Sequence, residues 1–171
     1  MNATIFVTDD EPAIRAALVK RLSRRHHRVM AFESGEALLQ ALDQEVPDLM
    51  LLDVKMPGLS GLDALKACRT KAPFALVIML TAYGTVQDAV EAMKLGAYDF
   101  VIKTVDLDGM EQVLDRALEL FELRRRLSYQ SEQDRHQYAM AMDSVNSSSR
   151  RSGVSPVSTN VASTAFNNVV P

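Results

Sequence analysis

Residues 4–13 are TIFVTDDEPA, an apolar run that ends at two adjacent aspartates. The run itself is typical of a strand in the core of a domain. Asp9 and Asp10 cannot both be buried and ionised at its end without a large desolvation cost, unless a cation compensates their charge. The acid pair therefore raises the question of what compensates its charge where this strand ends.

Short apolar runs alternate with amphipathic segments along the following hundred or so residues. The sequence predicts strands at 4–8, 28–32, 48–52, 76–80 and 99–102, separated by helices at 11–25, 35–44, 61–70 and 86–95, with a last helix from about residue 108. Such alternation predicts right-handed crossovers and a parallel sheet with helices on both faces. We therefore expect an α/β fold, a flavodoxin-like (βα)5 three-layer sandwich with strand order 2-1-3-4-5 and a C-terminal helical extension.

The length and composition of the chain fit one domain with an extension. The chain has 171 residues, of which 47% are hydrophobic, and a formal net charge of -3. We expect a domain at 1–125, a helical linker at 126–145 and a disordered tail rich in Ser and Asn at 146–171. Neither direct nucleic-acid binding nor a membrane span is predicted. The single cysteine and the absence of a signal-peptide pattern indicate the cytoplasm.

Chemically active side chains follow four of the predicted strands. Asp9 and Asp10 end the first strand, Asp53 the third, Thr81 the fourth, and Lys103 follows the fifth. Ligands of open parallel sheets bind outside the carboxyl ends of the strands, so these side chains should meet at one edge. Clustered carboxylates repel one another unless a cation joins them, and hard oxygen ligands at a partly open site favour Mg²⁺. An isolated aspartate pair is more often a solvated turn, so the prediction of a site depends on the coincidence of all five residues.

Four motifs extend this pattern to a known family. They are DDE (9–11), LLDVKMPGLSGL (51–62), MLTAYG (79–84) and GAYDFVIK (96–103). Together they resemble the receiver domain of two-component response regulators over residues 1 to about 125. The stretch TAYGTVQDAVEAMKLGAYDF, followed by a long Arg-rich helix, is most similar to the receivers of sigma-54-dependent transcriptional activators.

The resemblance implies a phosphorelay role. Asp53 would accept a phosphoryl group from a sensor histidine kinase or a phosphotransfer protein and become an aspartyl phosphate. The direct Mg²⁺ ligands would be Asp10, Asp53 and the backbone carbonyl of Lys55, with Asp9 acting nearby through a metal-bound water. Lys103 would supply a second positive charge to the phosphoryl oxygens. The protein would not be an enzyme on other substrates, because it would catalyse only its own phosphoryl transfer and dephosphorylation.

The resemblance also implies a switch. The Thr81 hydroxyl would move to the phosphoryl group, and Phe100 would turn inward into the vacated space, which would reshape the face made by the fourth helix, fifth strand and fifth helix. Without the motif match, Phe100 would be an ordinary strand aromatic. One position departs from the family, which usually has a cis proline after the lysine. Here Thr104 follows Lys103, and a cis bond would cost roughly 3–4 kcal/mol, so the geometry of this bond stays open.

Apolar residues on the last helix and the linker suggest self-association. Leu118, Phe121 and Leu127 continue past the point where a compact domain needs them. We expect a weak homodimer through the switch face and the linker, tightened by phosphorylation. The competing interpretation is that Leu118 and Phe121 pack on their own sheet and that the chain is monomeric.

Two other functions compete with the phosphorelay role. A Mg²⁺-dependent phosphatase on the same fold would need a further acid–base residue and a substrate pocket, and the sequence indicates neither. A receiver-like interaction module that never takes phosphate is disfavoured by the complete set of site residues. No effector domain is visible, and the sequence leaves open whether the chain acts alone or within a larger regulator.

Overall fold

A parallel sheet forms the centre of the protein, as the computed structural model describes it over residues 2–82, 84–103 and 107–151. Within these residues the strands are β1 (Thr4–Thr8), β2 (Arg28–Phe32), β3 (Leu49–Asp53), β4 (Leu76–Thr81) and β5 (Asp99–Ile102). Their order is β2-β1-β3-β4-β5, and every pairing is parallel. The predicted flavodoxin-like fold with order 2-1-3-4-5 is therefore confirmed.

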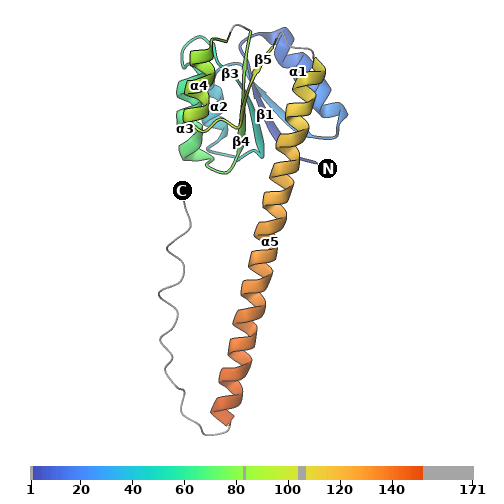
Figure 1. Cartoon of the computed structure of the whole chain (residues 1–171), viewed down its shortest axis with the longest axis vertical. Coiled ribbons are helices and arrows are strands. Elements are labelled where there is room, and N and C mark those ends of the chain that lie inside the picture. Colours follow the sequence, from blue (N-terminus) through green and yellow to red (C-terminus); the bar gives the residue numbers. More distant parts are fainter. Residues whose placement is uncertain (1, 83, 104–106, 152–171) are drawn as a thin grey trace. The chain divides into compact units, whose positions relative to one another are not determined.

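Helices cover both faces of the sheet (Figure 1). They are α1 (Pro12–Arg24), α2 (Gly35–Ala41), α3 (Gly61–Lys71), α4 (Val86–Lys94) and α5 (Leu107–Arg151). The helices α2, α3 and α4 pack with one face of the sheet into one hydrophobic cluster. The helix α1 and the first turns of α5 pack with the other face into a second cluster. The central strands β3 and β4 are buried throughout, which explains why their sequences are apolar without alternation.

Local sequence signals place the starts of three helices. Ser34 and Ser60 cap α2 and α3 by accepting a hydrogen bond from the backbone N–H three residues on. The sequence TVQD (85–88) has the spacing that predicts a capping box at the start of α4. This prediction is confirmed, because Thr85 and Asp88 each accept the other's backbone N–H. These caps fix where each helix leaves the carboxyl edge of the sheet.

The chain divides into two compact units, Met1–Arg124 and Arg125–Pro171. The helix α5 continues past residue 145, where the sequence predicted the linker helix to end, because no Gly or Pro follows Gly109 in the sequence before Arg151. The predicted disorder of residues 152–171 and the geometry of the Lys103–Thr104 bond lie outside the described residues. Among the residues described, none of the helices is long and apolar enough to cross a membrane.

Only some of the apolar residues expected at a dimer interface are exposed. Leu118 and Phe121 are half-buried and pack against the second core cluster, as the competing interpretation expected of these two side chains. The reason is that the second cluster, which α5 shares with α1 and one face of the sheet, takes in α5 residues as far as Phe121. Leu127 is exposed in the second unit, as predicted. Whether the chain is a monomer or a dimer stays a prediction.

Candidate functional site

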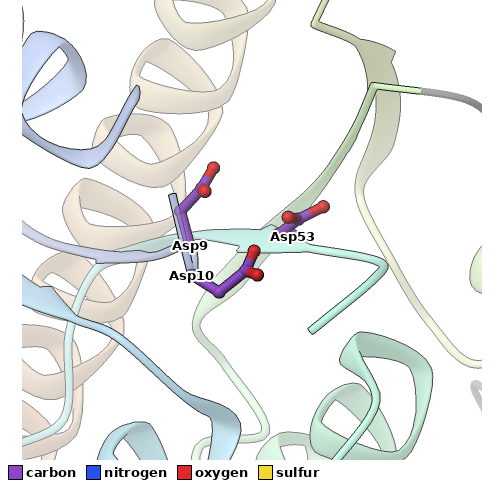
Figure 2. A group of neighbouring side chains, drawn as sticks. All are labelled: Asp9, Asp10 and Asp53. Atoms are coloured by element: carbon purple, nitrogen blue, oxygen red, sulfur yellow. The ribbon is translucent and has the colours of Figure 1, made fainter. Parts of the chain in front are cut away.

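Three aspartates meet where β1 and β3 end (Figure 2). Asp9 and Asp10 directly follow β1, and Asp53 is the last residue of β3, the strand beside it. Each side chain offers a carboxylate oxygen, and the three oxygens lie within 4.8 Å of one another. Asp9 and Asp53 are almost fully buried, with 0% and 3% of their surface exposed. The predicted convergence of these acids at one sheet edge is therefore observed.

Lys103 brings a positive charge to the same cluster from the end of β5. Its Nζ lies 2.7 Å from Asp9 Oδ2 and 2.9 Å from Asp53 Oδ2. The Lys103 side chain is only 9% exposed, so water screens these ion pairs weakly. The backbone holds the residue in place, because the Lys103 N–H donates to the Thr81 carbonyl at 2.7 Å. Glu11 Oε1, at 3.8 Å from Nζ, adds a third acid that the sequence reasoning did not assign.

Burial and charge act in opposite directions on the ionisable groups of the cluster. Burial raises the pKa of Asp53 above its ordinary value, and the hydrogen bond and charge of Lys103 offset this only in part. For Lys103, burial by itself lowers the pKa, but the hydrogen bonds and charges of Asp9 and Asp53 outweigh it and raise the pKa. The ammonium group therefore stays protonated at neutral pH, and Asp53 carries an energetic cost for its charge that a further cation would relieve.

Backbone hydrogen bonds orient the first acid. Asp9 Oδ1 accepts the Glu11 N–H at 2.9 Å, and the Asp9 carbonyl accepts from Arg15 Nη1 at 2.6 Å. The Asp9 N–H donates to the Phe32 carbonyl at 3.2 Å and so ties the turn to β2. These contacts fix the turn between β1 and α1, which leaves Asp10 half-buried at the rim of the cluster.

The loop after β3 is held equally closely. Asp53 Oδ1 accepts the Lys55 N–H at 3.3 Å, while the Lys55 side chain is exposed. The Gly61 N–H donates to the Val54 carbonyl at 3.0 Å. A Cβ at residue 61 would lie 1.9 Å from the Asp53 carbonyl oxygen, so only glycine allows α3 to begin against the backbone of this loop. The LSGL part of the sequence motif thus positions the segment that carries Asp53 and Lys55.

Thr81 and Phe100 complete the set of predicted site residues. Thr81 ends β4 next to β3 and is fully buried, and Phe100 is a half-buried residue of the neighbouring strand β5. Both lie against Gly84, since a Cβ at that residue would approach each of them within 2.7 Å. Gly84 and Glu11 had no predicted role, although the sequence motifs TAYG and DDE contain them.

The comparisons with known proteins agree with this geometry. A family model described as the response regulator receiver domain matches residues 5–115, which is more than half of the chain. The chain belongs to this family. Receiver domains of this kind are regulatory modules.

The proteins that are similar to this receiver include a curated regulator and two solved structures. Regulatory protein AtoC of Escherichia coli (strain K12) is 34% identical over 125 residues, which cover 73% of this chain and 27% of AtoC. NtrX of Brucella abortus is 35% identical with a TM-score of 0.69, over 75% of this chain and 29% of NtrX. TrrA of Thermotoga maritima, solved in complex with Mg²⁺-BeF, is 32% identical with a TM-score of 0.61, over 67% of this chain and 97% of TrrA.

The similarity to AtoC covers only part of that protein. AtoC belongs to the sigma-54-dependent activators, so the predicted similarity of this receiver to theirs is confirmed. The chain spans about a quarter of the length of AtoC, and the remaining parts of AtoC have no counterpart in the match.

Proposed function

We propose that this receiver takes a phosphoryl group onto Asp53 from a sensor histidine kinase or a phosphotransfer protein. The observation that carries the proposal is the setting of Asp53, a buried carboxylate at the end of a central strand with an ammonium group 2.9 Å away. Two further carboxylates lie beside it and supply the ligands for a second cation. This combination of a nucleophile and converging positive charge is what phosphoryl transfer requires.

The acidic cluster fits Mg²⁺. Three carboxylate oxygens within 4.8 Å of one another are hard ligands, and their mutual repulsion falls when a divalent cation binds. The direct ligands would be Asp10, Asp53 and the carbonyl of Lys55, with Asp9 interacting through a metal-bound water. Bound there, Mg²⁺ would neutralise charge on the phosphoryl oxygens. TrrA, similar to this chain, has been solved with Mg²⁺-BeF, which supports the assignment.

The transfer follows from the position of the Asp53 carboxylate. One of its oxygens attacks the phosphorus of a phosphohistidine and forms a new P–O bond. The P–N bond breaks, and its electron pair stays on the imidazole nitrogen of the donor. In dephosphorylation, water attacks the same phosphorus, the bond to Asp53 breaks, and inorganic phosphate leaves. Lys103 stabilises the added negative charge in both steps, because its ammonium group already lies against this carboxylate.

Thr81 and Phe100 would convert this chemistry into a change of surface. The Thr81 hydroxyl would donate to a phosphoryl oxygen on Asp53, and the Phe100 ring would move into the space that Thr81 leaves. The surface made by α4, β5 and α5 would change shape as a result. Support for the pair comes from the strand order, because β4 lies between β3, which carries Asp53, and β5, which carries Phe100.

The same surface is our candidate for a weak homodimer tightened by phosphorylation. Val86, Val90 and Met93 form an exposed apolar stripe at helical spacing on α4, and Ile102 of β5 is also exposed. Sedimentation with and without beryllofluoride, a phosphoryl mimic, tests this part of the proposal. We expect a larger species with beryllofluoride, whereas a monomer under both conditions at hundreds of micromolar would contradict the dimer.

Phosphorylation itself is tested by incubating the protein with acetyl phosphate and Mg²⁺. We expect a mass gain of one phosphoryl group that is lost on acid treatment. Asp53→Asn should abolish this label, while the matched variant Asp9→Asn keeps the acceptor and therefore keeps some label. Undiminished labelling of Asp53→Asn at the same Mg²⁺ concentration would overturn the proposal.

A further inference from the structure

Gly84 lies in direct contact with both residues of the proposed switch. A Cβ built on Gly84 would lie 2.7 Å from Phe100 Cε1, 2.8 Å from Phe100 Cζ and 2.7 Å from Thr81 Cγ2. Real Cβ atoms essentially never approach other atoms closer than 3.0 Å. The observed positions of the Phe100 ring and the Thr81 methyl group are therefore compatible only with glycine at residue 84.

This contact reaches α4 through a rigid connection. Thr85, the next residue, is the N-cap of α4, and its hydroxyl accepts the Asp88 N–H at 3.1 Å. Asp88 Oδ2 accepts the Thr85 N–H in return at 3.0 Å. The reciprocal bonds lock the first turn of the helix, so a displacement at Gly84 cannot be absorbed by fraying of that turn.

The two residues on the other side of the contact differ in their freedom to move. Thr81 is fully buried, and its carbonyl is held by the Lys103 N–H at 2.7 Å. Phe100 is half-buried and packs at the margin of the first core cluster, which includes Ala92 of α4. A side chain added at residue 84 would therefore displace the Phe100 ring before it displaces Thr81.

We propose that Gly84 is a positioning residue of the switch, which transmits movements of Thr81 and Phe100 to α4 because its missing side chain keeps the start of the helix in contact with both. The inference rests on the proposed function, since it concerns how phosphorylation of Asp53 reaches the α4 surface. A methyl group at residue 84 expels the ring from this contact and uncouples α4 from the site.

The contact itself is tested without phosphate by a double-mutant cycle. Gly84→Ala should lower the folded-to-unfolded ratio by about fivefold or more, as expected for one extra methyl group in a packed site. Leucine lacks the ring atoms Cε1 and Cζ that the new methyl group would meet. The loss of stability caused by Gly84→Ala should therefore be clearly smaller in a Phe100→Leu background. Gln87→Ala, an exposed change on α4, serves as the control and should be nearly neutral.

Equal losses in the two backgrounds would overturn the contact and with it the inference. If Gly84→Ala alone does not fold, recovery of folding in the Gly84→Ala/Phe100→Leu variant supports the same contact. Failure of both variants to fold contradicts it.

The transmission is tested by the amide chemical shifts of α4 on addition of Mg²⁺ and beryllofluoride. In wild type and Gln87→Ala we expect these shifts to change on saturation. In Gly84→Ala we expect the change in α4 to fall to half or less, while the amides around Asp53 still respond. A wild-type response of α4 in Gly84→Ala overturns this inference alone. No response anywhere in the wild type contradicts the proposed function itself.

Discussion

Lys103→Met is the change that tests most directly what holds the acidic edge together. In the folded protein the Lys103 ammonium lies between Asp9 and Asp53, at 2.7 and 2.9 Å. Methionine keeps the length and the apolar stem of the side chain but removes the charge. The two carboxylates then face each other in a buried site without a cation.

The structure allows the size of the effect to be estimated. All three side chains are at least nine-tenths buried, so the pairs are poorly screened by water. Removal of one partner from a buried ion pair costs about 3–5 kcal/mol, because the remaining charge stays desolvated and uncompensated. For a chain of this size each 1 kcal/mol shifts the melting temperature by about 2–4 °C, so a loss of roughly 6 °C or more is expected without Mg²⁺.

Thermal unfolding followed by circular dichroism, in chelator and then in millimolar Mg²⁺, measures this loss. Because a cation bound by the carboxylates replaces the missing charge, Mg²⁺ should restore more stability to Lys103→Met than it adds to wild type. Lys66→Met is the matched control, since Lys66 pairs with Asp63 at 3.3 Å on the exposed side of α3. If Lys103→Met and Lys66→Met melt together in chelator, the reasoning about the buried charge cluster is wrong.

Three further changes test other parts of the structure. Millimolar Mg²⁺ should raise the melting temperature of wild type, and the gain should shrink in Asp10→Ala, which lacks one carboxylate ligand; equal gains would contradict the metal site. Thr85→Ala should cost about 1 kcal/mol in urea unfolding by removing the cap of α4. Hydrogen bonds from the Thr85 backbone N–H and hydroxyl hold the pKa of Asp88 below its ordinary value of 3.8, and Thr85→Ala removes the second of these two bonds. A depressed folded-state pKa stabilises the fold above the unfolded value, so the difference between wild type and Thr85→Ala should be constant near neutral pH and shrink as the pH falls below about 4; a difference that does not vary with pH would refute the role of Asp88. Gly61→Ala should cost about 3 kcal/mol or more, because its Cβ meets the Asp53 carbonyl oxygen at 1.9 Å and backbone cannot yield easily; urea unfolding at the wild-type midpoint would show that the loop relaxes.

Much of the fold could be predicted from local patterns in the sequence. The alternation of apolar runs with amphipathic segments predicted the five parallel strands and their order, and the spacing of Thr85 and Asp88 predicted a capping box. The acid cluster was predictable as well, because the carboxyl ends of parallel strands share one edge and the sequence shows which residues end each strand. These inferences need only the periodicity of apolar residues along the chain and the geometry of parallel sheets.

The contacts between side chains from distant segments depended on the tertiary structure. The sequence placed Lys103 near the acids, but only the packed structure shows that it contacts Asp9 as well as Asp53. The sequence also did not determine whether the apolar side of α5 was free, and the structure packs Phe121 against the sheet.

The contact of Gly84 with the switch residues shows the same division. A glycine in a turn signals only that the chain can bend there, and nothing local to TAYG tells which side chains fill the space of its missing Cβ. The sequence by itself therefore determined the elements, their order and the residues at the active edge, because those follow from periodicity along the chain. The contacts between side chains became visible only in the folded structure, because strand register and close packing bring together residues that are far apart in the sequence.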